Sequence, residues 1–244
     1  MDLTQAKPSA PQTPSSLRHT DLLQLREVSK TYVTDGEPVH ALNGVSFTLG
    51  AGDFVALVGR SGCGKSTLLN LSGAMDFPTT GQVLLDGVST SELDDNGLTR
   101  LRRGKVGFIF QAFQLLNTLS VLENVELPLL LAGESKTAQR AGHNLQLVEL
   151  ADLGNRMPHQ LSGGQMQRVA IARAMVHDPK LLLADEPTGN LDTQTGNMIL
   201  DLLRRIANQQ KTAVLMATHS MEAANIADAV VRMRDGRIEE VIRR

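Results

Sequence analysis

Short apolar runs alternate with segments of helical periodicity along most of this 244-residue chain. Four of the runs have the length of a buried strand, and they are Phe54 to Val58, Val106 to Phe110, Leu181 to Ala184 and Ala213 to Ala217. Helical patterns follow over 165–176 and 193–208. Buried strands that alternate with helices predict an α/β domain with a largely parallel central sheet.

The segments around this core have different patterns. Between 120 and 149 the sequence is helical in character, which predicts a helical subdomain over about 112–175 inserted into one domain over 21–244. A short terminal β pair is expected around the Asp235-Gly236 turn. An antiparallel β subdomain beside the core is predicted by three β-prone segments, which are Leu22 to Val28, Val39 to Leu49 and Gln82 to Asp86.

The composition limits the classes of function. The 24 Lys and Arg residues nearly balance the 26 Asp and Glu residues, so we predict no nucleic-acid partner. The single cysteine, Cys63, excludes an intrachain disulfide and favours a reducing, cytoplasmic location. Residues 1–20 are rich in Pro, Ser and Thr and predict a disordered tail. The apolar stretch from Leu127 to Ala132 is far too short to span a bilayer, so any membrane role is expected to depend on a partner.

A phosphate-binding motif follows the first apolar run. The residues Gly59-Arg60-Ser61-Gly62-Cys63-Gly64-Lys65-Ser66 have the pattern GxxxxGK[ST]. Glycines let the backbone turn so that its N–H groups converge on phosphate oxygens, while Lys65 supplies a charge and Ser66 a hydroxyl for Mg²⁺. The next segment, Thr67 to Leu71, is predicted to be a helix whose N-terminus faces the phosphates. Strand, glycine loop and helix together predict a P-loop NTPase (RecA-like) core.

A second motif, LSGGQ, occupies Leu161 to Gln165. Structurally it predicts Ser162 as the N-cap of a helix that runs from Gln165 to Val176, with two loop glycines between them. Functionally it predicts an anion site, because the first N–H groups of a helix lack partners within the helix. The two interpretations are compatible.

Polar side chains follow three of the predicted core strands. Asp185 and Glu186 are predicted to hold Mg²⁺ and to act on an attacking water, and the alternative is an ordinary polar turn. Gln111 can reach Mg²⁺ or water, or is simply solvated. His219 is expected at the same sheet edge, and its alternatives are a helix cap or a solvated surface residue.

Two further side chains each admit two interpretations. Tyr32, the only tyrosine, either stacks on an adenine ring or packs on a β-surface. Cys63 lies beside Lys65 and a helix start, both of which favour a reactive thiolate, or it is a small residue tolerated in the loop.

In this order the motifs resemble those of the nucleotide-binding subunits of ABC (ATP-binding cassette) transporters, from about Leu22 to Arg244. The resemblance implies three catalytic residues, Glu186, His219 and Gln111, and three Mg²⁺ ligands, Ser66, Gln111 and Asp185. It also implies a set of ATP contacts, which are Tyr32, Gly59, Arg60, Ser61, Gly62, Cys63, Gly64, Lys65, Ser66, Thr67, Ser162, Gly163, Gly164, Gln165 and Asp192.

The resemblance further implies partners. In that family two subunits meet head to tail, so a second copy of this chain is expected to complete each ATP site. An integral membrane permease-type subunit is the other expected partner, which implies a peripheral location on the cytoplasmic face of the inner (cell) membrane. Segments 122–130 and 188–192 are similar to the branch that contains macrolide exporters, lipoprotein-releasing complexes and the cell-division ATPase, although Ser220 replaces an acidic residue of that branch.

The alternative function is that of a soluble ABC-type ATPase, for example one that serves an iron–sulfur scaffold. The stretch between Lys65 and Asp185 is too short for the long coiled coil of DNA-repair members. A sensor without turnover is disfavoured because Glu186 and His219 are both present. Co-purification with an integral membrane protein would distinguish these classes.

Overall fold

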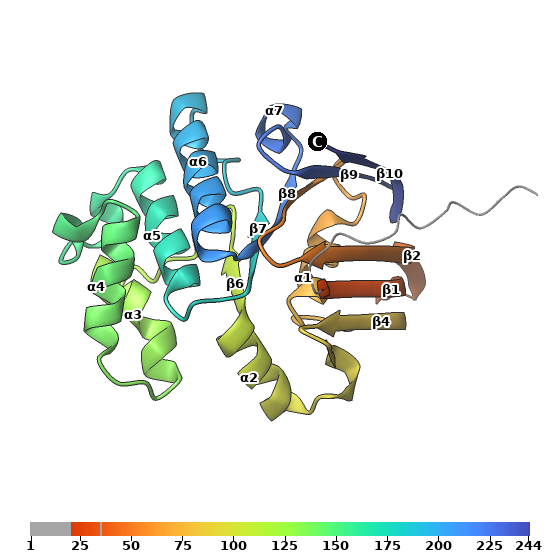
Figure 1. Cartoon of the computed structure of the whole chain (residues 1–244), viewed down its shortest axis with the longest axis horizontal. Coiled ribbons are helices and arrows are strands. Elements are labelled where there is room, and N and C mark those ends of the chain that lie inside the picture. The colour runs from red at the N-terminus through yellow and green to blue at the C-terminus, as the bar shows by residue number, and fades with distance from the viewer. Residues whose placement is uncertain (1–20, 35) are drawn as a thin grey trace, which may run out of the picture.

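A six-stranded sheet forms the centre of the structure, a computed structural model that describes residues 21–34 and 36–244 (Figure 1). The predicted disordered tail over 1–20 lies outside the described residues. Neighbouring strands are parallel except for β10, which pairs with β9 in the antiparallel sense. The order is β10 (Arg237–Arg243), β9 (Ala229–Arg234), β3 (Phe54–Val58), β8 (Ala213–Thr218), β7 (Leu181–Asp185) and β6 (Val106–Ile109).

A second sheet of four strands is antiparallel, as the sequence predicts. Its first two strands are longer than predicted because β-bulges let them bend without losing their pairing. The order is β2 (Glu37–Gly50), β1 (Asp21–Thr34), β4 (Thr80–Leu85) and β5 (Val88–Ser89). Figure 1 shows β1, β2 and β4 on one side of the molecule and α3, α4 and α5 on the other.

The helices connect and cover the strands. They are α1 (Lys65–Ser72), α2 (Asp95–Lys105), α3 (Val121–Leu131), α4 (Thr137–Leu147), α5 (Gly163–Met175), α6 (Thr193–Gln210) and α7 (Met221–Ala224). Three 3₁₀ turns lie at Thr90–Glu92, Ala151–Leu153 and Pro158–Gln160. Within the described ranges, none of these helices combines the length and the apolar character needed to cross a bilayer.

Alternation along the buried strands gives the central sheet two apolar faces. Phe54, Ala56 and Val58 of β3 join the cluster that includes residues of α3 to α7. Val55 and Leu57 point the opposite way, into the cluster formed with α1 and the antiparallel sheet. Burial on both faces explains why the core strands are continuous apolar runs in the sequence.

Four details differ from the sequence-based expectation. Helix α5 begins at Gly163 and ends at Met175, so the two glycines that were predicted to lie in a loop belong to the helix. The first helix begins at Lys65, two residues before the predicted start. The helical stretch over 120–149 forms two helices, because Gly133 and Lys136 adopt positive φ between them. Helix α2 was not predicted, since its 11 residues include Gly97 and Gly104 and only two apolar side chains, Leu98 and Leu101.

An ion pair between Asp228 and Arg204 fixes the start of β3, the strand that precedes the phosphate loop. The Asp228 carboxylate accepts hydrogen bonds from the Phe54 backbone N–H at 2.9 Å and from Arg204 of α6 at 2.8 Å. The Arg204 hydrogen bonds hold the pKa of Asp228 below its usual range, although burial opposes them. The pair therefore joins α6, β3 and the segment that leads into β9.

We expect Asp228→Ala to lower the free energy of unfolding by about 1–2 kcal/mol, because the variant leaves the guanidinium and the N–H without their acceptor. Since the pKa of Asp228 is lowered by folding, its contribution is complete above about pH 5 and is lost as the pH falls below about 4. Urea unfolding at several pH values measures this, with exposed Asp201→Ala of α6 as the control. A difference that grows toward low pH would contradict the assignment.

Candidate functional site

The carboxyl ends of four parallel strands bring the candidate residues to one sheet edge. Strand register aligns Val58 with Thr218 and Asp185 with Ala217, so the segments that follow these strands leave the sheet at the same level. They border a cavity of about 510 Å³. Its lining consists of Val39, His40, Ala41, Ser61, Gly62, Gly64, Lys65, Ser66, Thr67, Gln111, Asp185, Glu186 and His219.

The phosphate loop over 59–66 is shaped for an anion. Gly64 is the N-cap of α1 at φ 105°, and a Cβ there would lie 2.5 Å from the Ala41 carbonyl oxygen. Only glycine fits this backbone and this close approach of β2. Because glycine brings no side-chain cap, the first N–H groups of α1 remain available to a ligand.

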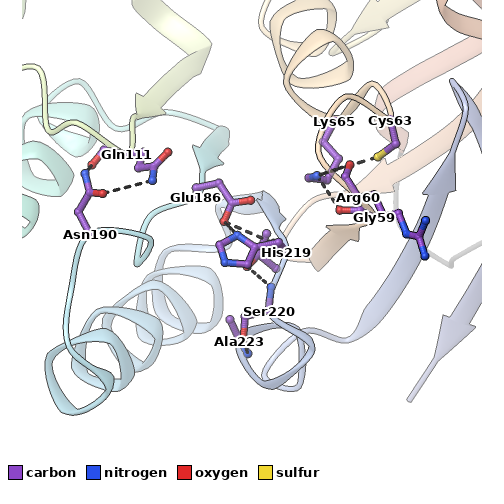
Figure 2. Close-up of polar contacts among 11 residues, drawn as sticks. Gly59, Arg60, Cys63, Lys65, Gln111, Glu186, Asn190, His219, Ser220 and Ala223 are labelled. Atoms are coloured by element: carbon purple, nitrogen blue, oxygen red, sulfur yellow. Dashed lines mark hydrogen bonds and ion pairs between the residues drawn. The ribbon is translucent and has the colours of Figure 1, made fainter.

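Lys65 holds a positive charge at the floor of the loop. Its side chain is buried, and its Nζ donates to the carbonyl oxygens of Gly59 at 2.8 Å and Arg60 at 3.2 Å (Figure 2). Carbonyl dipoles rather than a carboxylate hold the ammonium, so its charge is not neutralised by these contacts. A phosphate that enters the cavity meets this charge together with the helix N-terminus.

Asp185 and Glu186 occupy different environments. Burial raises the pKa of Asp185 and outweighs the hydrogen bond from the Ser66 hydroxyl and the charge of Lys65, which act in the opposite direction. Glu186 adopts a positive φ of 50°, and its N–H donates to the Ala217 carbonyl oxygen at 3.0 Å. The strand end thus turns sharply at Glu186, and both carboxylates border the same cavity.

His219 contacts the second of these carboxylates. Its Nδ1 lies 2.9 Å from Glu186 Oε2, as Figure 2 shows, and its ring is mostly exposed. The following Ser220 caps α7, accepting from the Ala223 N–H at 3.1 Å. Ser220 therefore orders the turn after the histidine although it brings no charge, and the helix-cap interpretation belongs to Ser220 rather than to His219.

The oxygen groups near Ser66 suit a hard divalent cation. The Ser66 hydroxyl lies close enough to the Asp185 carboxylate to lower the pKa of that carboxylate, and Gln111 borders the same cavity. In the part of the chain that the structure describes, no three His, Cys, Asp or Glu side chains cluster as a metal site. This donor set fits Mg²⁺, which is commonly held by one or two protein groups, water and substrate phosphates.

Tyr32 does not line the cavity, but it lies close to Thr67, which does. Its hydroxyl donates to Asp76 Oδ2 at 2.7 Å, and Lys30 Nζ lies 4.8 Å from the ring centroid. Burial, followed by the bonded and negatively charged Asp76, raises the pKa of Tyr32. Sequence reasoning missed Lys30 and Asp76, because residues so far apart in the chain meet only through the fold.

The LSGGQ segment does not border either of the two cavities lined by phosphate-loop residues. Ser162 and Gln165 form a reciprocal capping box at the start of α5, with bonds of 3.3 and 2.9 Å. A Cβ on Gly164 would overlap the Thr195 methyl group, so glycine lets α5 meet α6 without displacing Thr195. Asp192 caps α6 nearby through Thr195. One chain therefore presents these residues apart from its own phosphate loop.

Comparison with known proteins gives a consistent result. A profile described as ABC transporter matches residues 42–189. An ABC transporter ATP-binding protein of Thermotoga maritima is 48% identical over 225 residues, which cover 91% of this chain and 96% of that protein. A macrolide export ATP-binding/permease protein of Chlorobaculum tepidum is 44% identical, and the match covers 88% of this chain but only 33% of that longer protein.

Solved structures agree with the sequence comparisons. The cassette MJ0796 of Methanocaldococcus jannaschii, in a dimeric post-hydrolysis state bound to ADP and Pi, has a TM-score of 0.83 and 41% sequence identity. That match covers 91% of this chain and 98% of the other. A second dimeric structure of the same cassette has a TM-score of 0.84.

The position of Cys63 favours a packing role over a reactive thiol. Its side chain is buried, and its Sγ would lie 2.6 Å from a Cβ placed on Gly59. We expect N-ethylmaleimide to modify the folded protein at least about tenfold more slowly than the urea-unfolded chain, and bound MgATP to slow the reaction further. Mass spectrometry follows the adduct, and Cys63→Ser is the control. Equal rates with and without MgATP would show that Cys63 does not lie beside the nucleotide.

Proposed function

This chain belongs to the ABC transporter family, and on that premise we propose that it is the ATP-binding and ATP-hydrolysing subunit of a transporter, driving a separate transmembrane partner through ATP-dependent dimerisation. The observation that carries the proposal is the division of the motifs between two places. The phosphate loop, Asp185, Glu186 and His219 share one cavity, whereas the LSGGQ segment lies outside it. Such a chain carries two halves of a site that it does not close by itself.

ATP is the substrate whose charge these halves match. Its phosphates would lie on the N–H groups at the start of α1, with Lys65 exchanging its loop carbonyls for phosphate oxygens. Tyr32 beside Thr67 would stack on the adenine, with its hydroxyl fixed by Asp76. Ser66, Asp185 and Gln111 would hold Mg²⁺, which neutralises phosphate charge and favours attack on the γ-phosphorus.

A second copy of this chain would close the site. Its α5, capped by Ser162, brings another helix N-terminus toward the γ-phosphate. The negative charges of ATP then attract both subunits, and the closed dimer is stable while the γ-phosphate is present. Phosphate release removes part of that charge, so the dimer opens.

Hydrolysis needs a positioned water. Glu186, a mostly buried carboxylate next to Asp185, would orient this water and accept its proton. His219 would leave Glu186 and donate a hydrogen bond to the γ-phosphate, since its exposed ring is free to turn toward a ligand. The hydrogen bond between Glu186 and His219 already holds both side chains at the cavity where these roles place them.

The helical subdomain over about 112–175 would transmit the motion to a permease-type partner. It joins the core next to Gln111 and exposes several large apolar side chains, which are Leu116, Leu130, Leu131 and Leu147. Such a partner would place this chain peripherally on the cytoplasmic face of the cell membrane. The names of the relatives, ABC transporter ATP-binding proteins, favour this role over that of a soluble ABC-type ATPase.

The role of Glu186 leads to a direct test. Glu186→Gln keeps the size of the side chain but removes its negative charge and its capacity to accept a proton, so turnover should fall by about a hundredfold or more. ATP binding should persist, and MgATP should hold the variant as a dimer during size-exclusion chromatography. Turnover equal to that of the parent would exclude Glu186 as the base, and a monomer with MgATP would contradict ATP-driven dimerisation.

Mixed dimers test whether LSGGQ acts on the ATP of the other subunit. Ser162→Arg and Lys65→Ala should each abolish hydrolysis alone, because each variant dimer lacks one half of both sites. An equal mixture should recover about one quarter of parental activity, since about half of the dimers are mixed and each mixed dimer has one intact site. If a subunit used its own LSGGQ, the mixture would stay inactive.

A further inference from the structure

Gln111 and Asn190 form a reciprocal pair across the end of the sheet. The Asn190 Nδ2 donates to the Gln111 backbone oxygen at 3.0 Å, and the Gln111 Nε2 donates to Asn190 Oδ1 at 3.3 Å (Figure 2). The two residues are 79 positions apart, so the fold brings them together. None of the roles described above uses Asn190.

This pairing determines whether the oxygen or the NH₂ group of each side-chain amide faces the other residue of the pair. A backbone carbonyl oxygen can only accept, so it selects the NH₂ group of Asn190. The Asn190 oxygen then faces Gln111, where it selects the Gln111 NH₂ group. The remaining atom of that amide, the Gln111 oxygen, points away from Asn190, toward the side of Glu186 in Figure 2.

Asn190 is itself held in a fixed turn. The Gly189 N–H donates to the Glu186 carbonyl oxygen at 3.0 Å, and the Leu191 N–H donates to the Thr188 carbonyl oxygen at 3.1 Å. A Cβ on Gly189 would lie 2.7 Å from Gln111 Nε2, so the glutamine amide packs directly on this turn. The turn that carries the carboxylate Glu186 therefore also sets the position of Gln111.

We propose that Asn190 is a positioning residue that orients the Gln111 amide with its oxygen toward the metal in the ATP site. The proposal rests on the proposed function of Gln111 as a Mg²⁺ ligand. An amide oxygen is a ligand for Mg²⁺ and an NH₂ group is not, so a glutamine in the opposite orientation would repel the cation. Residues that orient metal ligands commonly change metal affinity by tenfold or more.

The test measures binding rather than turnover. In the Glu186→Gln background, the dissociation constant of ATP is determined with EDTA and with Mg²⁺, and their ratio gives the metal-dependent gain in affinity. Asn190→Ala should reduce this gain about tenfold, as should Gln111→Ala, and the double variant should lose no more than either alone. Gly189→Ala, which displaces the amide by contact, should reduce the gain similarly.

Asn208→Ala, an exposed asparagine of α6, is the matched control and should keep the parental gain. Thermal unfolding should be nearly unchanged in Asn190→Ala, because an exposed neutral pair contributes little to stability. The proposal would be overturned if Asn190→Ala kept the parental gain in ATP affinity with Mg²⁺. It would also be overturned if Asn190→Ala reduced this gain equally in proteins with Gln111 and with Gln111→Ala. Absence of ATP binding by the Glu186→Gln protein in both conditions would instead overturn the proposed function, and the positioning role with it.

Discussion

The parallel pairing of β3, β8, β7 and β6 is the constraint on which the rest of the structure depends. Parallel strands in one sheet end at one edge, so loops from distant parts of the sequence meet there. The phosphate loop follows β3, His219 follows β8, Glu186 follows β7 and Gln111 follows β6. A shift of one strand by one residue would exchange its side chains between the two core clusters, each of which is packed around the residues that it now holds, and this packing opposes the shift.

A second consequence of the fold is that the LSGGQ helix lies outside the phosphate cavity. Close packing of Gly164 on Thr195 and of Gly163 near Leu191 holds α5 against α6 and the turn that precedes it in the same chain. The helix therefore does not reach the phosphate loop of its own chain without losing this packing. In the proposed dimer, the charge of ATP supplies the attraction that joins the two halves, and its removal supplies the signal to open.

Much of this arrangement can be predicted from the sequence, because it is encoded locally. The strand Phe54–Val58 is an uninterrupted apolar run, and the glycine spacing after it specifies a phosphate loop. Contacts between distant segments cannot be predicted in this way. Asn190 shows no sign of its pairing with Gln111, and Lys30 and Asp76 show none of their contacts with Tyr32. The division into α3 and α4 depends on two positive φ angles that a helical pattern does not reveal.

A structure of the Glu186→Gln protein with MgATP tests the central claim most directly. The account predicts two ATP molecules in a symmetric dimer, each with its γ-phosphate within hydrogen-bonding distance of Lys65 of one subunit and of the Ser162 hydroxyl or the first N–H groups of α5 in the other. An ATP-bound protein in which each γ-phosphate contacts a single chain, with the LSGGQ segment exposed to solvent, would contradict it.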